Sequence, residues 1–443
     1  LRLIGDPERV ITEQIEDKYL SDTLGRRRGT AAALVFPLST AEVSAVMRYA
    51  YERSVPVTPR GAGTNLVGST VPRGQGIILD FSRMNHILEV DEATFTATVE
   101  PGVLLKDFQA HVEAMGLFYP PDPGEKESTL AGNISTNAGG MRAVKYGVTR
   151  DYVRGLEIVL ADGQVMTVGS KNVKDASGLP RKLLFIGSEG TQGVITKCVL
   201  RLVPKPEKSL SVLVPYGELK TGIASVHAVL MADANPTAVE FIERSVVELG
   251  ERYTGVHFPC PQAQAYLLLT FDGHGETVEK NAQRVHQVVQ DNGALDYIEL
   301  TDPALAADIW RVRGCFVKAV EAVSEQEPVD LVVPIDKTAE FIAYVHELEA
   351  ESGMQMVSFG HAGDGNVHLC IVRGQRDEET WNRELHRNME RLYRKAYDLG
   401  GLTSGEHGVG LAKQPYFLEN TPDINLAVMR SVKDALDNRH ILN

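Results

Sequence analysis

The sequence predicts an α+β protein built from two units. Short apolar strands alternate with amphipathic helices along the chain, and its 443 residues exceed the roughly 100–200 residues of one domain. The run Val203-Pro204-Lys205-Pro206 separates two stretches of different texture, and its two prolines disfavour regular strand pairing, which predicts a linker. The glycines cluster without a fixed period, which argues against a repeat solenoid.

The elements of the first unit follow from local patterns. Ser39-Thr40-Ala41-Glu42 has the pattern of a capping box, and the apolar stripe behind it predicts a helix through Ala50. Strands are expected at 55–58, 77–80 and 94–99, and a helix at 104–115. The segments 156–160 and 164–168 flank Ala-Asp-Gly, which predicts a hairpin.

The second unit repeats the alternation over about 200 residues, as expected of one further domain. Strands are expected at 210–214, 265–271, 329–335 and 367–372, and helices near 218–231, 276–292, 303–325 and 336–351. From about residue 402 the chain is rich in glycine and then helical, and it is expected to return to the first domain. The predicted domains are 1–204, 205–401 and 402–443.

Composition narrows the function. The net charge of −14 disfavours nucleic acid and anionic lipid as partners. Four distant cysteines without a CxxC pair argue against a disulfide scaffold, a cysteine-rich zinc site and an iron–sulfur cluster. No apolar run approaches the roughly 20 residues of a transmembrane helix, and residues 1–18 lack a signal-peptide core. A cytoplasmic protein is therefore expected.

Three glycine-rich loops are candidates for ligand binding. The loop Arg60-Gly61-Ala62-Gly63-Thr64-Asn65 follows a predicted strand and suits either a phosphate cradle or a tight turn. It lacks the Gly-Lys-Ser/Thr of a P-loop and the third glycine of a dinucleotide fingerprint.

The stretch 120–140 is richer still in proline, glycine and small polar residues, and it is expected to form no element of its own. It fits either a large flat ligand with many acceptors or an irregular surface loop. The third loop, 187–195, precedes a strand.

A second group of candidates contains histidine and glutamate. His361 and His368 flank a glycine-rich bend, and Glu406 and His407 lie in another. Two imidazoles and a carboxylate are sufficient for an open divalent-metal site, although loop histidines more often serve only as hydrogen-bonding groups. Asp364 is a rival carboxylate, but a role in capping its own turn suits it better.

These motifs resemble known families. The segments 60–65, 120–147 and 187–195 resemble the FAD-binding domain of the vanillyl-alcohol oxidase / p-cresol methylhydroxylase superfamily. The segments 359–368 and 404–410 are similar to those of the FAD-linked D-2-hydroxyacid dehydrogenases, and 119–155 is most similar to bacterial members that use an electron-transferring flavoprotein. The resemblance implies a two-lobed FAD-binding domain, a substrate (cap) domain with an antiparallel sheet, and a C-terminal segment on the FAD domain.

The resemblance also implies the cofactor residues. The loop 60–65 would hold the FAD pyrophosphate. The flavin and ribityl side would be lined by Thr129, Gly132, Asn133, Ser135 and Asn137, and the adenosine side by Ile195. Additional contacts would come from Pro121, Gly190, Gly193, Glu406 and Asn443. Some relatives attach FAD covalently through a histidine near the first loop. No histidine occurs at 55–76, so noncovalent FAD is expected.

The implied reaction is oxidation of a 2-hydroxy acid, with hydride transfer to flavin N5. By resemblance, His361, His368 and Glu406 would hold one divalent metal (zinc, or iron or manganese), His407 would act as the base, and Arg313 would bind the substrate carboxylate. Arg313 could instead be a solvated helix residue. Electrons would pass to an electron-transferring flavoprotein, or to a quinone or cytochrome. Whether the chain forms a homo-oligomer stays open.

The sequence after Arg313 bears on the substrate. Relatives that act on five-carbon diacids have additional polar and lysine residues there, whereas this chain has Cys315-Phe316-Val317 and Pro328-Val329-Asp330. This favours D-lactate over D-2-hydroxyglutarate, with glycolate as a further alternative. Two other hypotheses are a metal-dependent hydrolase built on the same histidines and a flavin-binding scaffold without catalysis. The intact candidate residues argue against the scaffold.

Overall fold

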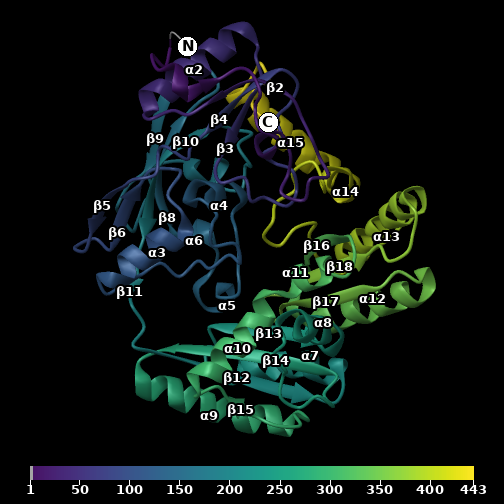
Figure 1. The fold of residues 1–443 in the computed structure, drawn as a ribbon. Helices are drawn as coiled ribbons and strands as arrows, with labels where there is room; N and C mark the ends of the chain where they lie inside the picture. The colour runs from purple at the N-terminus through teal and green to yellow at the C-terminus, as the bar shows by residue number, and fades with distance from the viewer. Residues whose placement is uncertain (1–2) are drawn as a thin grey trace. The chain divides into compact units, whose positions relative to one another are not determined.

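The computed structural model describes residues 3–443 and divides into two compact units (Figure 1). Unit 1 contains Leu1–Gly139, Val148–Lys205 and Glu406–Asn443, and unit 2 contains Gly140–Gly147 and Pro206–Gly405. The predicted α+β class is confirmed. The unit bounds differ from the predicted domains in three places: residues 140–147 belong to unit 2, Lys205 belongs to unit 1, and the return to unit 1 begins at Glu406.

Unit 1 contains two main sheets. The first has the order β1-β2-β4-β3, in which β2 and β3 each run parallel to β4, and the second is an antiparallel sheet of order β5-β6-β10-β8-β9. The strands are β1 (Val10–Ile11), β2 (Ala31–Val35), β3 (Val57–Arg60), β4 (Gly76–Asp80), β5 (Ile87–Asp91), β6 (Thr96–Val99), β8 (Val153–Val159), β9 (Val165–Gly169) and β10 (Val194–Arg201). The pairing of β8 with β9 confirms the predicted hairpin.

Helices cover these sheets and carry the C-terminal segment. They are α1 (Asp17–Leu20), α2 (Thr40–Arg53), α3 (Leu105–Ala114), α4 (Leu130–Thr136), α6 (Thr149–Tyr152), α14 (Gln414–Asn420) and α15 (Asp423–Leu436). The buried stripe of α2 packs in one core with Ile441 and Leu442. The Val57 amide donates to the Ile441 carbonyl (2.7 Å), which fixes the end of the chain against β3.

Three local predictions for unit 1 need correction. The stretch 128–140 does form an element, α4, because Thr129 caps a short run with enough buried apolar residues (Leu130, Ile134) to pack. Val203–Pro204 is not unpaired but forms β11 against β7 (Leu117–Phe118). Ser39 caps α2 as expected, yet Glu42 completes no capping box, because its carboxylate accepts from the Leu38 amide and pairs with Arg9.

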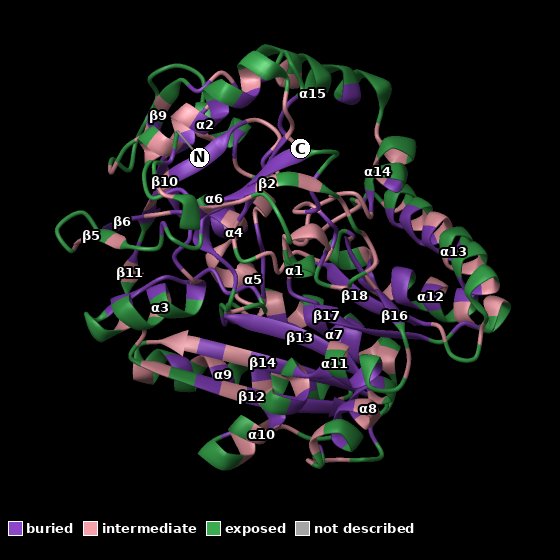
Figure 2. Ribbon diagram, turned by 45° about the horizontal axis from the view of Figure 1, so that its top comes forward, coloured by how far each residue is buried: buried purple, intermediate pink, exposed green. Residues whose placement is uncertain are grey.

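Unit 2 is built on a seven-stranded antiparallel sheet of order β15-β12-β14-β13-β17-β18-β16. The strand β13 lies in the middle of the sheet and is buried along its whole length (Figure 2). The strands are β12 (Lys208–Tyr216), β13 (Ala238–Glu243), β14 (Ala265–Gly273), β15 (Ile298–Glu299), β16 (Gln326–Val332), β17 (Met356–His361) and β18 (Asn366–Val372).

The helices of unit 2 are α5 (Ala143–Tyr146), α7 (Leu219–Met231), α8 (Arg244–Thr254), α9 (Gly275–Asp291), α10 (Pro303–Gly314), α11 (Phe316–Glu321), α12 (Thr338–Ser352) and α13 (Glu378–Asp398). The helix predicted at 303–325 is divided at Cys315. The segment 140–147 is held in unit 2 by Asp272, which accepts from Lys145 Nζ (2.5 Å) and the Tyr146 hydroxyl (2.9 Å).

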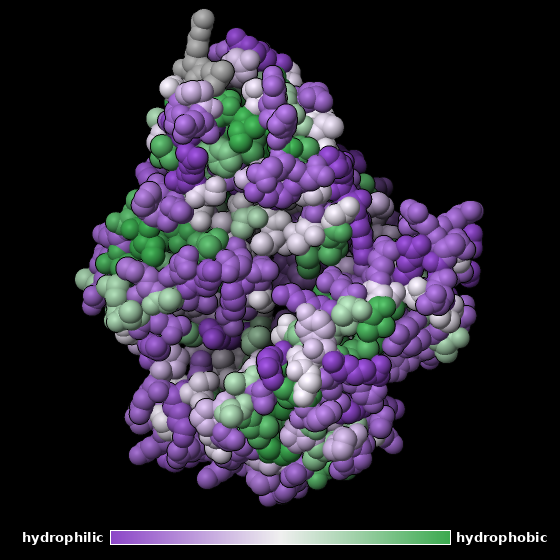
Figure 3. Space-filling view, in the orientation of Figure 1, coloured by the Kyte–Doolittle hydropathy of each residue, from purple (hydrophilic) through white to green (hydrophobic). Residues whose placement is uncertain are grey.

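Hydrophilic residues dominate the molecular face in Figure 3, in keeping with a net charge of −14. Within residues 3–443, no helix is long and apolar enough to cross a membrane.

Candidate functional site

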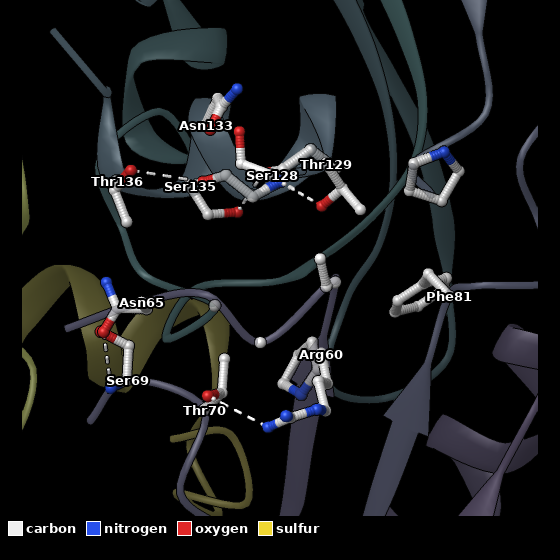
Figure 4. Close-up of a pocket in the computed structure, with 18 of the residues that line it drawn as sticks. Arg60, Asn65, Ser69, Thr70, Phe81, Ser128, Thr129, Asn133, Ser135 and Thr136 are labelled. Carbon is white, nitrogen blue, oxygen red and sulfur yellow. Dashed lines mark hydrogen bonds between the residues drawn. The ribbon is translucent and has the colours of Figure 1, made fainter. Parts of the chain in front are cut away.

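Unit 1 contains a pocket whose walls are largely backbone and small side chains. Arg60, Thr70 and Phe81 lie on one side of it, and residues of α4 lie on the other (Figure 4). The Arg60 guanidinium donates to the Thr70 hydroxyl (3.3 Å) and to the Lys18 carbonyl (2.5 Å). The buried cation thereby supports the loop that follows β3.

The loop 60–65 is fitted tightly against the start of α4. A Cβ on Gly61 would overlap the Thr129 hydroxyl, and Gly63 has a φ of +74°, where residues with a side chain are strained. Thr129 Oγ1 in turn accepts from the Gly132 amide (3.2 Å) as the N-cap of α4. Glycine is therefore needed here for close approach of two backbone segments.

We expect Gly61→Ala to weaken FAD binding, because the new methyl must displace Thr129. Overpacking of this kind costs about 1–3 kcal/mol, which corresponds to roughly 5- to 150-fold in Kd. Apoprotein titrated with FAD, followed by flavin fluorescence, measures the effect. Gly124→Ala is the matched control, because a Cβ there has nothing within 4 Å. An unchanged Kd for Gly61→Ala would contradict the expectation.

Most of the predicted cofactor residues line this pocket, namely Arg60, Gly61, Ala62, Gly63, Thr64, Asn65, Thr129, Gly132, Asn133, Ser135, Gly190, Gly193 and Ile195. Among the residues that the structure describes, four predicted ones do not line it. Asn137 ends α4 and accepts from the Arg150 amide (3.0 Å). Asn443 donates to the carbonyls of Ser69 and Glu189 (3.0 Å each). The other two are Pro121 and Glu406.

Glu189 is a lining residue that sequence reasoning missed. Its carboxylate accepts from the amides of Val409 (2.7 Å) and Gly410 (2.9 Å) and from the Ser69 hydroxyl. Asn65 Nδ2 donates to the His407 carbonyl (3.0 Å). Two loops of the pocket thus hold the loop that carries His407. In the sequence, the one sign of the role of Glu189 was an acidic residue within a glycine motif.

In unit 2, His361 and His368 lie on the adjacent strands β17 and β18. Their rings meet edge to face, with centroids 5.1 Å apart and planes at 88°. Both residues are buried, and a ring nitrogen of each lies within 4.8 Å of one in the other. The hairpin forms because Gly365, with φ +79°, turns the chain between the strands. Two converging imidazoles of this kind suit a metal with nitrogen ligands.

Glu240 on β13 joins this pair to Arg313, and no sequence pattern predicted its role. Its Oε1 lies 2.5 Å from His361 Nδ1, and its Oε2 accepts from Arg313 Nε (3.0 Å) and Nη2 (2.5 Å). Burial raises the pKa of the Glu240 carboxyl, but the charges and hydrogen bonds of His361 and Arg313 outweigh it and lower that pKa to about 2. Arg313 is therefore not a solvated helix residue.

A second buried carboxylate, Asp330, supports the chain before Glu406. It lies opposite His368 in the register of β16 and β18. It accepts from the Ser404 hydroxyl (2.6 Å) and the Gly405 amide (3.2 Å). The chain passes from unit 2 to unit 1 directly after Gly405.

Glu406 and His407 are the first residues of the returning unit 1 segment. His407 Nε2 lies 3.7 Å from Glu406 Oε1. A Cβ on Gly139 would lie 3.0 Å from Glu406 Oε2, so glycine leaves room for the carboxylate. Asp364 caps its own turn by accepting from the Asn366 amide (3.1 Å), which agrees with the structural role expected for it.

The family follows from these features together with comparison to known proteins. Residues 31–169 match the family model described as FAD binding domain, and residues 205–443 match FAD linked oxidases, C-terminal domain. The chain belongs to this FAD-linked oxidase family and is an FAD-dependent oxidoreductase. The resemblance drawn from its motifs is confirmed.

Individual relatives cover nearly the whole chain. D-lactate dehydrogenase of Anaerostipes hadrus is 40% identical over 99% of this chain and 94% of that protein. Glycolate oxidase subunit GlcD of Bacillus subtilis (strain 168) is 37% identical over 96% of this chain and 90% of that protein. The crystal structure of p-cresol methylhydroxylase with substrate bound has a TM-score of 0.81 at 18% identity, covering 99% and 93% of the two chains, which confirms the predicted fold.

Proposed function

We propose that this chain oxidises a small D-2-hydroxy acid, with D-lactate as the preferred substrate, using noncovalent FAD and one divalent metal ion. The observation that carries the proposal is the buried chain Arg313–Glu240–His361 with His368 beside it. It combines a cation suited to a carboxylate with two imidazoles suited to a metal. The names of the two relatives above support the 2-hydroxy acid class.

Arg313 is proposed to bind the substrate carboxylate. Its Nε and Nη2 are engaged by Glu240, whereas its Nη1 has no hydrogen bond to another described residue. The pair with Glu240 holds the guanidinium in one orientation, so little freedom is lost when a carboxylate binds. A charge-assisted hydrogen bond from Nη1 would orient the acid.

His361, His368 and Glu406 are proposed to hold the metal, with zinc suited to two nitrogens and one oxygen and with iron or manganese as alternatives. When bound, the ion supplies polarisation of the substrate hydroxyl, and FAD supplies the hydride acceptor. His407 is proposed to accept the hydroxyl proton at its ring nitrogen. The backbone contact with Asn65 would hold this base in place.

The surroundings of Arg313 favour a short substrate. The rings of Phe316 and Phe359 lie 5.8 and 5.3 Å from its guanidinium carbon, and Phe359 also stacks on His368 (5.6 Å). Apolar walls accommodate a methyl group at little cost but desolvate a second carboxylate. D-Lactate is therefore proposed ahead of D-2-hydroxyglutarate.

Anaerobic titration of the flavin tests the proposal. D-Lactate, L-lactate, glycolate and D-2-hydroxyglutarate are added separately, and loss of the oxidised flavin absorbance is recorded. We expect D-lactate to bleach the flavin at the lowest concentration and L-lactate to leave it oxidised. No bleaching by any of the four acids would contradict the proposed reaction, and faster bleaching by D-2-hydroxyglutarate would reverse the substrate order.

The cofactor is proposed to be released on denaturation, because no histidine lies at 55–76. Acid precipitation followed by absorbance of the supernatant checks this expectation. A yellow pellet would contradict it.

An electron-transferring flavoprotein is proposed as the electron acceptor, with a quinone or cytochrome as the alternative. A cytoplasmic location stays a prediction from the sequence.

A further inference from the structure

We infer that Glu240 is a positioning residue that couples the substrate-carboxylate site to the metal site, so that one buried carboxylate sets both metal affinity and substrate affinity. The inference rests on the proposed function, because it takes Arg313 as the carboxylate site and His361 as a metal ligand. It goes further by assigning a role to a residue that contacts neither the substrate nor the metal.

The geometry places Glu240 between two partners that lie far apart in the sequence. It faces His361 directly in the antiparallel pairing of β13 with β17, and its side chain is fully buried. Oε1 is used for His361 and Oε2 for Arg313, with contacts of 2.5 to 3.0 Å. Each oxygen therefore serves one partner, and the length of a single carboxylate sets the spacing between them.

The contact with His361 determines which ring nitrogen can bind a metal. A carboxylate only accepts hydrogen bonds, so His361 Nδ1 carries the hydrogen and the Nε2 lone pair is the one that can ligate. Outer carboxylates of this kind fix the ring and raise its basicity, and their loss typically costs 10- to 100-fold in metal affinity.

The contact with Arg313 fixes the guanidinium in the same way. Its Nε and Nη2 converge on the single oxygen Oε2, and these two charge-assisted hydrogen bonds hold the guanidinium plane, which directs Nη1. In a 2-hydroxy acid the carboxylate and hydroxyl are on neighbouring carbons, so their separation is nearly constant. Glu240 joins Arg313 and His361 rigidly, so the spacing of the carboxylate site and the metal ligand can match that separation. Without Glu240, the two side chains would move independently and the match would be lost.

Glu240→Gln is the principal test, made on the FAD-loaded enzyme. The amide keeps the volume but presents a donor to one of two partners that are themselves donors. We expect zinc affinity, measured by competition with a chromophoric chelator without substrate, to fall 10- to 100-fold. We also expect KM for D-lactate at saturating zinc to rise at least about tenfold, with a smaller change in kcat.

Glu243→Gln is the matched control. Glu243 is on the same strand, is also buried, and also contacts a histidine, but that histidine is His346 and not a proposed metal ligand. A purely structural effect would appear in both variants. Equal changes in both, or a change in only one of zinc affinity and KM for Glu240→Gln, would overturn the inference.

Glu240→Asp provides a second reading in case Glu240→Gln does not fold. Aspartate keeps the charge but is one methylene too short to hold both partners. We therefore expect a smaller fall in zinc affinity and a smaller rise in KM for D-lactate than in Glu240→Gln. If zinc affinity and KM were both unchanged, the inference would be overturned. Measurements on the wild-type enzyme distinguish failure of the inference from failure of the proposed function. If the wild type bound none of zinc, iron and manganese, or if D-lactate did not bleach its flavin, the proposed function itself would be contradicted, and the inference with it.

Discussion

Replacement of His368 by alanine is expected to lower kcat for D-lactate by at least about 10³-fold while FAD stays bound. The loss of Lewis-acid assistance is worth several kcal/mol, and each 1.36 kcal/mol is about tenfold in rate. His368 is in unit 2, whereas the pocket lined by most of the predicted FAD residues is in unit 1, so the flavin content should not change. Steady-state kinetics, bound zinc and the flavin spectrum are the three measurements.

His386→Ala is the control for this variant. His386 is also in unit 2 but is a surface residue of α13, paired with Glu390 (3.1 Å). It should retain full activity and metal content. Full activity of a wild-type preparation stripped of metal would show that His368 acts in some other way and would remove the metal from the proposed function.

Arg313→Met is expected to raise KM for D-lactate by about 100-fold. Truncating one partner of a buried charge pair costs roughly 2–5 kcal/mol, and this change also removes the proposed carboxylate donor. Arg313→Lys keeps the charge but lacks the planar guanidinium, so its KM for D-lactate should lie between those of Arg313→Met and the wild type. Initial rates over a wide range of D-lactate concentrations measure the effect.

Stability must be followed in the same variants. Arg313→Met leaves Glu240 buried with His361 alone, a change that costs roughly 3–5 kcal/mol when a buried pair is broken. Arg311→Met is the matched control, because Arg311 is on the same helix and pairs with Asp308 at the surface. A folded Arg313→Met variant with an unchanged KM would refute the carboxylate role.

Much of the scaffold could be predicted from local sequence. The α2 helix and the hairpin of β8 with β9 follow from capping and from alternation around a turn signal. A turn in the loop 60–65 could be predicted because the positive φ of Gly63 is a local backbone requirement, whereas the fit of Gly61 against Thr129 could not. Local patterns suffice where the stabilising contacts are local.

The predictions of secondary structure failed where contacts between residues far apart in the sequence determine the local structure. The α4 helix has few apolar residues and depends on packing within unit 1, so its composition predicted a loop. Ala238–Glu243 contains two glutamates, which hides a fully buried strand, because Glu240 is neutralised by Arg313, which lies 73 residues later. No single segment contains both charges, so the pair is invisible until the sheet is assembled.

The chain passes between the units four times, at residues 139/140, 147/148, 205/206 and 405/406. A gene fragment ending near residue 205 would therefore carry a stretch whose Lys145 and Tyr146 have lost Asp272, and a fragment starting there would lack that stretch altogether. Neither half is a self-contained module. Grafting unit 2 onto a different flavoprotein would require transplanting the eight-residue segment 140–147 together with it.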